Sequence, residues 1–157
     1  MTYWRMQLHP SSREEAVDYT IRSLAACYIG LDFAAEVGDL LATEQSELPA
    51  NQRDYWAFAR EMQEGDLVLI FAHHFPFAMA RVAGPYNYIR SSDPNLGVWF
   101  RHFRRVDSIR YYADYITNAH QWESIKMTDT ISPLRQADTA SYRLIEEWRR
   151  RSQSQVR

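Results

Sequence analysis

The sequence predicts an α+β domain in which a curved sheet or small β-barrel is flanked by helices. The hydrophobic pattern runs strand, helix, strand, helix, a cluster of strands and a last helix, which favours a mixed α+β fold. The 157 residues, 46% hydrophobic and 24% charged, have the composition of an ordinary folded domain. We expect residues 1–151 to form a single domain and residues 152–157 to be a disordered tail.

The first part of the chain predicts two strands and a helix between them. Residues 3–8 alternate loosely between apolar and polar, which indicates a strand. The segment Ser12–Glu15 has the pattern of a capping box and predicts a helix that runs to about Cys27. The apolar face of this helix is predicted at Val17, Ile21, Leu24 and Tyr28. A short strand is expected at 28–33, and the polar residues 41–50 indicate a loop or a frayed helical turn.

A second helix and a hairpin are predicted next. The apolar face of the helix is predicted at Tyr55, Phe58, Ala59 and Met62. Gly65 suits the end of this helix, because glycine adopts the left-handed conformation of a C-terminal cap at little cost. Residues 67–72 are apolar on both faces, which predicts a central strand covered on both sides. A turn at 73–76 then leads to a hairpin partner at 77–82.

The last part of the chain predicts strands and a final helix. Residues 91–97 are rich in turn formers, and 98–109 indicate one or two strands. The signals in 111–136 are mixed and favour no element. Asp138 or Thr139 can cap the final helix. Its apolar face is predicted at Leu144, Ile145 and Trp148.

Charge, cysteine count and hydropathy exclude several classes of protein. The net charge of −2 gives no global basic field for nucleic acid, so such binding would need a local patch. Cys27 is the only cysteine, so neither an intramolecular disulfide nor a cysteine-cluster zinc site can form, and we expect this thiol to be buried. No apolar run is long enough to cross a bilayer, and the first residues lack a signal-peptide pattern. We expect a cytoplasmic protein with no membrane partner.

Catalytic and metal-binding patterns are missing from the sequence. His73 and His74 are adjacent and point in different directions on a regular strand, so they cannot ligate one metal together. The other histidines, His9, His102 and His120, are scattered, which favours solvated or hydrogen-bonded side chains. No nucleophile or phosphate-loop motif is present. We therefore expect no enzyme, no cofactor and no metal; the alternative is a small metal-dependent hydrolase or nuclease that uses His73 and His74.

One segment combines arginines with aromatic rings. Lys126 is the only lysine among 18 basic residues, and four of the arginines fall within 101–110, interleaved with Phe100 and Phe103. Arginines contact phosphates and rings stack on bases, so this segment predicts a nucleic-acid surface. The residues predicted to contact backbone phosphates are Arg101, Arg104, Arg105 and Arg110. The alternative is a solvated strand face.

Four stretches of sequence carry a resemblance to a known family. They are Tyr28–Phe33 with Gly38–Leu40, then Glu64–Val68, Met79–Tyr88 and His102–Val106. In this order they resemble the EVE-like branch of the PUA superfamily, which is related to YTH domains and to N-terminal modules of Mcr-type modification-dependent restriction systems.

The resemblance implies a PUA-like barrel whose aromatic pocket accepts a flipped-out, modified base. Trp99 lies where YTH relatives have a cage tryptophan, Phe33 resembles a substitute for another, and Tyr86 and Tyr88 are further walls. The implied function is a non-enzymatic reader of DNA that carries a modified, methylated base, serving a nuclease or motor domain of a restriction or defence system. The same fold could read modified RNA, and a protein-interaction domain whose aromatic residues are all core is a third possibility.

Overall fold

The computed structural model describes residues 1–8, 15–33, 35–72, 75–91, 100–111, 125 and 129–154. The strands are β1 (Tyr3–Gln7), β2 (Tyr28–Leu31), β3 (Leu67–Ala72), β4 (Phe75–Val82), β5 (Asn87–Tyr88), β6 (His102–Tyr111) and β7 (Ile131–Leu134). The α-helices are α1 (Ala16–Ala25), α2 (Trp56–Arg60) and α3 (Ala140–Ser154). Short 3-10 helices, η1 (Leu40–Ala42), η2 (Gln45–Glu47) and η3 (Ala50–Tyr55), lie between β2 and α2.

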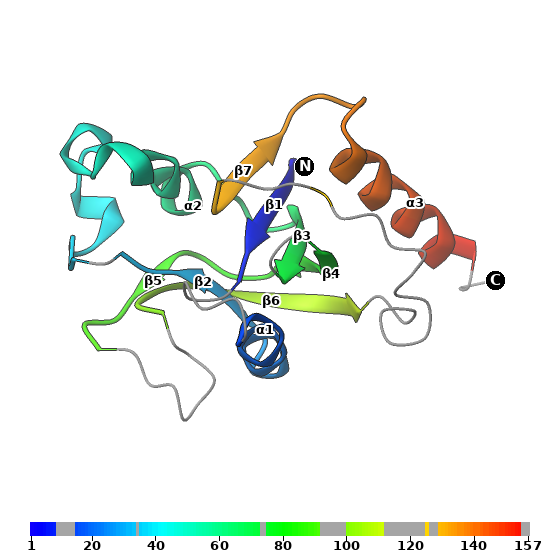
Figure 1. Ribbon diagram of the computed structural model, residues 1–157, viewed down its shortest axis with the longest axis horizontal. Coiled ribbons are helices and arrows are strands. Elements are labelled where there is room, and N and C mark those ends of the chain that lie inside the picture. Colours follow the sequence, from blue (N-terminus) through cyan, green and yellow to red (C-terminus); the bar gives the residue numbers. More distant parts are fainter. Residues whose placement is uncertain are drawn as a thin grey trace.

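The strands form one mixed sheet that curls into a half-barrel (Figure 1). Their order is β2-β6-β4-β3-β1-β7, and β5 pairs with β6. β1 and β3 run parallel, and Tyr3 lies opposite Leu67 in their register. The other strand pairs are antiparallel. The predicted α+β class with a curved sheet is confirmed.

The predicted central strand and its hairpin are confirmed. β3 lies between β1 and β4, and its side chains alternate between two apolar layers. Val68 and Ile70 face the core inside the half-barrel, whereas Leu69 and Phe71 face the outer layer. A strand buried on both faces needs apolar residues at every position, which explains the uninterrupted apolar run in the sequence.

The outer layer is formed by α3, which packs across β1 and β3 (Figure 1). Thr139 caps this helix, since its Oγ1 accepts a hydrogen bond of 3.3 Å from the backbone N–H of Tyr142. Ile145 and Trp148 are buried against the sheet, as predicted. α3 continues to Ser154 and so enters the segment expected to be a tail; residues 155–157 lie outside the described part.

The segment from η3 to α2 packs against β7 and contributes to the core inside the half-barrel. The Tyr55 hydroxyl is 2.7 Å from Oγ1 of Thr130, next to β7, and the Tyr55 ring packs on Phe33, just after β2. The residues predicted for the apolar face of this helix, Tyr55, Phe58, Ala59 and Met62, are all buried. Gly65 was expected to end this helix, but α2 ends at Arg60 with Glu61 as its cap. Gly65 has a φ of +92° in the turn before β3, a conformation that glycine adopts at little cost.

Two expectations about α1 and its end are wrong. Ile21 is 44% exposed, whereas Thr20 and Ser23 are buried. Burial of these two costs little because the Thr20 hydroxyl bonds to the carbonyls of Leu8 and Ala16, and that of Ser23 to Tyr19. Cys27 is exposed, because it ends the helix with a φ of +63° and turns the chain into β2. The predicted capping box begins in residues outside the described part.

None of the helices in the described part of the chain is long and apolar enough to cross a membrane.

Candidate nucleic-acid interface

An aromatic cluster lies where β2, β5 and β6 meet at one end of the half-barrel. We define it as Phe33, Tyr55, Tyr86, Tyr88 and His102. The His102 ring is at its centre, with ring centroids 5.3 Å from Phe33, 5.9 Å from Tyr86 and 5.1 Å from Tyr88. The register of β6 places Tyr88 directly opposite His102, which accounts for their contact. Strand pairing therefore fixes Tyr88 and His102, whereas Phe33, Tyr55 and Tyr86 come from the segments that flank the strands.

His102 is neutral at physiological pH. It is 1% exposed, and this burial lowers its pKa to about 4. Its Nδ1 lies 2.6 Å from the Tyr86 hydroxyl, and that hydroxyl accepts a hydrogen bond of 3.1 Å from the backbone N–H of Leu40. Burial also raises the pKa of Tyr86, so the hydroxyl keeps its proton and donates it to Nδ1. We therefore assign the imidazole proton to Nε2.

Charged side chains surround the exposed edge of the cluster. Arg101 donates from Nε to Asp32 at 2.8 Å and from Nη2 to the Phe33 carbonyl at 2.9 Å. Its Nη1 is 3.8 Å from a carboxylate oxygen of Glu36, and the Tyr88 hydroxyl donates to the same carboxylate. The hydrogen bond to Glu36 raises the pKa of Tyr88. Glu36 and Arg101 are thus held beside the Tyr88 ring.

The four predicted pocket residues differ in accessibility. Phe33 and Tyr86 are 4% and 8% exposed and form the buried part of the cluster against His102, so neither ring is open to a ligand in this conformation. Tyr88 is half-buried and accessible. Trp99 lies outside the described residues, as do His73 and His74.

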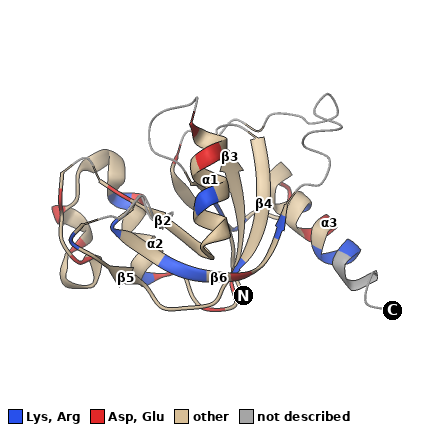
Figure 2. Cartoon of the chain, turned by 90° about the horizontal axis from the view of Figure 1, so that it is seen from below, with Lys and Arg blue, Asp and Glu red and all other residues tan. Residues whose placement is uncertain are grey.

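The four arginines predicted to contact phosphates also differ in accessibility. Arg105 and Arg110 are exposed on β6, and Arg101 is half-buried in its contact with Asp32. Figure 2 shows the basic stretch on β6.

Arg104 was predicted to contact phosphates, and the structure contradicts this. It is 4% exposed and faces the interior, where its guanidinium donates to backbone carbonyls at 2.7–3.3 Å. The acceptors are the carbonyls of Phe58, Ala59, Met62 and Gly84. A guanidinium occupied in this way cannot reach a phosphate, so we remove Arg104 from the phosphate-contacting set.

Four members of this site were missed in the sequence: Asp32, Glu36, the central His102, and Tyr55, which was predicted only for the apolar face of a helix. Asp32 directly follows β2, and alternation along β6 places His102 on the same inner face as Val106, so both positions carried a readable signal. Glu36 carried none, because its role depends on a contact with Tyr88, which is distant in sequence. Within the described part of the chain, no three His, Cys, Asp or Glu side chains come together as a metal site.

The fold and this site define a class: an α+β domain with a curled sheet and a charged, aromatic cluster at one end. The chain belongs to the family described as a domain of unknown function, DUF8426, whose model matches residues 4–134. No curated protein matches the chain.

Proposed function

We propose that this protein is a non-enzymatic reader that binds DNA carrying a modified, methylated base, which flips out of the duplex and stacks at the aromatic cluster. In this proposal it is the cytoplasmic recognition module of a restriction or defence system and works with a nuclease or motor domain. The observation that carries the proposal is the accessible Tyr88 ring, which packs on the neutral His102 with Glu36 and Arg101 beside it.

This arrangement suits a planar, hydrogen-bonding ligand. Stacking of a base on an aromatic side chain contributes roughly 1–3 kcal/mol and does not depend on sequence. A carboxylate accepts hydrogen bonds from amino groups of a base, and a guanidinium donates to carbonyl and ring-nitrogen acceptors. Glu36 and Arg101 can supply both kinds of contact at the edge of a base stacked on Tyr88. Trp99 stays a predicted second wall.

Contacts to the backbone are assigned to the exposed arginines of β6. Arg105 and Arg110 lie on the strand that also carries His102. Phosphate contacts fix the orientation of a protein on nucleic acid and make its affinity depend on salt, whereas base contacts give the specificity. We therefore assign positioning to Arg105 and Arg110, and recognition of the modified base to Tyr88 and its neighbours.

A binding panel tests this function. Duplex DNA, single-stranded DNA and RNA of one sequence are each prepared unmodified or with methyladenine, methylcytosine or hydroxymethylcytosine. We expect one modified DNA to bind more tightly than its unmodified counterpart, with an affinity that falls as salt is raised. Equal affinity for modified and unmodified forms of every polymer would refute the reader function, and a preference confined to RNA would reassign it.

Turnover is tested with the same substrates. In the presence of magnesium, manganese or zinc, we expect all of them to stay intact. Cleavage that is lost in His73→Ala or His74→Ala would replace the reader with a metal-dependent nuclease.

A further inference from the structure

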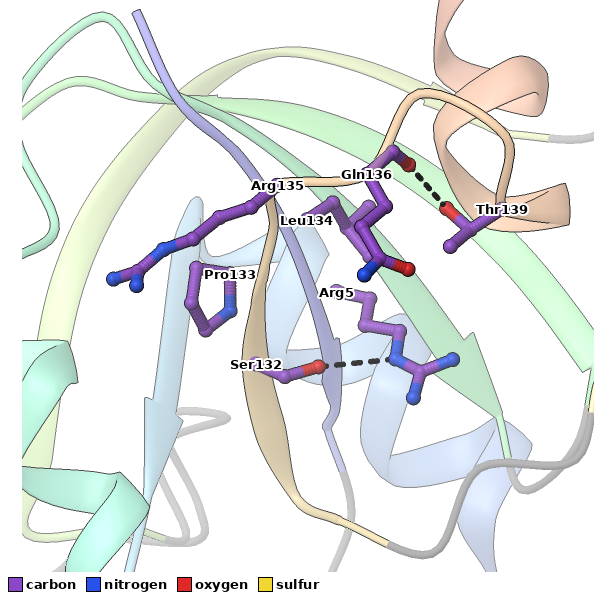
Figure 3. Close-up of a pocket in the computed structure, with 7 residues that line it drawn as sticks. All are labelled: Arg5, Ser132, Pro133, Leu134, Arg135, Gln136 and Thr139. Atoms are coloured by element: carbon purple, nitrogen blue, oxygen red, sulfur yellow. Dashed lines mark hydrogen bonds between the residues drawn. The ribbon is translucent and has the colours of Figure 1, made fainter.

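A hollow lies on the outer face of the sheet, beside β7 and the start of α3 (Figure 3). Its volume is about 370 Å³, which falls within the range of small-ligand sites. It is lined by Arg5, Ser132, Pro133, Leu134, Arg135, Gln136 and Thr139. Two of these residues are arginines and none is acidic, although the chain as a whole carries a net charge of −2. The lining therefore favours an anion.

Arg5 is the main cation of this hollow, and strand register holds it in place. β1 and β7 pair so that Arg5 lies directly opposite Ser132, and Arg5 Nε donates to the Ser132 hydroxyl at 3.0 Å. Its Nη2 is 3.2 Å from a carboxylate oxygen of Asp129, which is not part of the lining. No hydrogen bond is found for Arg5 Nη1 among the residues that the structure describes.

The opposite wall adds donors that suit an anion. Figure 3 shows the Gln136 amide directed toward the side of the hollow where Arg5 lies, whereas Arg135 extends away on the other side of β7. Arg135 is 3.6 Å from Glu61 and its side chain is 74% exposed. It therefore adds charge at the rim rather than a fixed contact. Thr139 caps the 15-residue helix α3, whose N-terminus carries partial positive charge.

We propose that this hollow binds a phosphate group, with Arg5 as the principal cation and Gln136 as an amide donor. A guanidinium offers parallel N–H donors that match phosphate oxygens. Strand register and the bond to Ser132 hold Arg5 in place, whereas the Asp129 carboxylate competes with a bound anion for the guanidinium. The phosphate comes either from a free nucleotide or from a nucleic-acid backbone. The proposal does not depend on the reader function, because none of the residues that line the hollow belongs to the aromatic cluster.

The test titrates inorganic phosphate, and separately AMP, into the ¹⁵N-labelled protein at constant ionic strength and follows backbone amide shifts by NMR. We expect saturable shifts confined to Arg5, its neighbours on β1 and the segment 130–140. Arg5→Gln should weaken binding at least about ten-fold, through loss of a charge-assisted contact. Gln136→Ala, at an exposed position, should weaken it less, and Arg150→Gln, an exposed arginine of α3 outside the lining, should leave it unchanged.

One variant separates binding from a purely structural role. Asp129→Asn removes the carboxylate that competes for Arg5, so phosphate should bind more tightly to this variant than to the wild type. If Arg5 serves only as the structural partner of Asp129, the same change gives no gain in affinity. Unchanged or weaker binding in Asp129→Asn would therefore overturn the proposal.

A duplex DNA arm identifies the source of the phosphate. Saturable binding of phosphate or AMP at this segment supports a free phosphorylated ligand. DNA affinity that falls in Arg5→Gln and Gln136→Ala but not in Arg150→Gln supports a backbone contact. If neither the small ligands nor DNA respond to these substitutions, the hollow is not a phosphate site, whatever the outcome of the modified-base panel.

Discussion

The buried Arg104 can be tested by removing its charge and hydrogen bonds while keeping much of its volume. Arg104→Met leaves an apolar side chain among the carbonyls of Phe58, Ala59, Met62 and Gly84, which then lose a common donor. Burial lowers the pKa of Arg104, and the nearby Asp66 and Glu64 carboxylates oppose this effect. Arginine is the side chain that holds its charge best when buried.

The expected magnitude follows from the four contacts, at 2.9, 3.1, 3.3 and 2.7 Å. A hydrogen bond from a charged group contributes about 1.5–3 kcal/mol, but burying the guanidinium costs several kcal/mol, which offsets part of the total. We expect Arg104→Met to lower the free energy of unfolding by about 3–5 kcal/mol, the size typical of removing one partner of a buried charged interaction. Arg104→Lys should recover only part of this, because an ammonium lacks the planar geometry that reaches four carbonyls.

The assay is urea unfolding followed by tryptophan fluorescence. The matched control is Arg105→Met, because Arg105 is adjacent in sequence but exposed, and we expect it to change stability by less than about 0.5 kcal/mol. In the binding panel Arg105→Met is the variant with the effect, since it should weaken DNA binding and reduce its salt dependence. If Arg104→Met and Arg105→Met unfold at the same urea concentration, the structural role assigned to Arg104 is wrong.

Three further predictions concern single side chains. Because the pKa of His102 is about 4 in the folded state and about 6.5 when unfolded, its neutral form stabilises the fold above pH 6.5, and this contribution is lost as the pH falls toward 4. Between pH 7.5 and 4.5 the wild type should lose about 2–3 kcal/mol more than His102→Gln in urea unfolding, and equal losses would contradict the assignment. Tyr88→Ala should weaken binding of the preferred modified DNA roughly five- to 150-fold in fluorescence anisotropy titrations. The control is Tyr28→Ala, which removes a half-buried ring away from the cluster and should leave this affinity unchanged. If Tyr88→Ala keeps the wild-type preference for modified over unmodified DNA, Tyr88 is not part of the binding site. Ser141→Ala should raise the free energy of unfolding by about 1 kcal/mol. The Ser141 hydroxyl is buried without a hydrogen-bond partner in the described structure, and alanine has the higher helix propensity. A lower melting temperature of the variant in calorimetry would show that the hydroxyl has a partner.

The elements that could be predicted are those in which local pattern and tertiary environment agree. The apolar run of β3 indicated a central strand because no exposed strand has such a composition. The hydroxyl of Thr139, followed by Ile145 and Trp148 at helical spacing, specified both the start and the buried face of α3. In these segments the residue types alone indicate which side chains are buried, so no knowledge of distant contacts is needed.

Elements whose environment depends on distant segments could not be predicted in this way. β7 is short and contains Pro133, and only its pairing with β1 makes it a strand. Arg104 was expected at the surface because arginine is rarely buried, although its position between His102 and Val106 placed it on the inner face. Thr20 replaced Ile21 in the buried face of α1 because its hydroxyl bonds to the Leu8 carbonyl, a contact that sequence spacing does not reveal.

The placement of β1 between β3 and β7 has a consequence for folding kinetics. Tyr3 pairs with Leu67 on one side and with Leu134 on the other, so the sheet closes only after two long chain segments have been brought together. Such non-local pairing slows folding, because the entropy of loop closure is lost before the contacts form. During synthesis β1 emerges well before either partner strand, and its apolar side chains Trp4 and Met6 stay without their final neighbours until β3 and then β7 follow. Until its partners pair with it, β1 is an unpaired apolar strand, which favours aggregation of the nascent molecule.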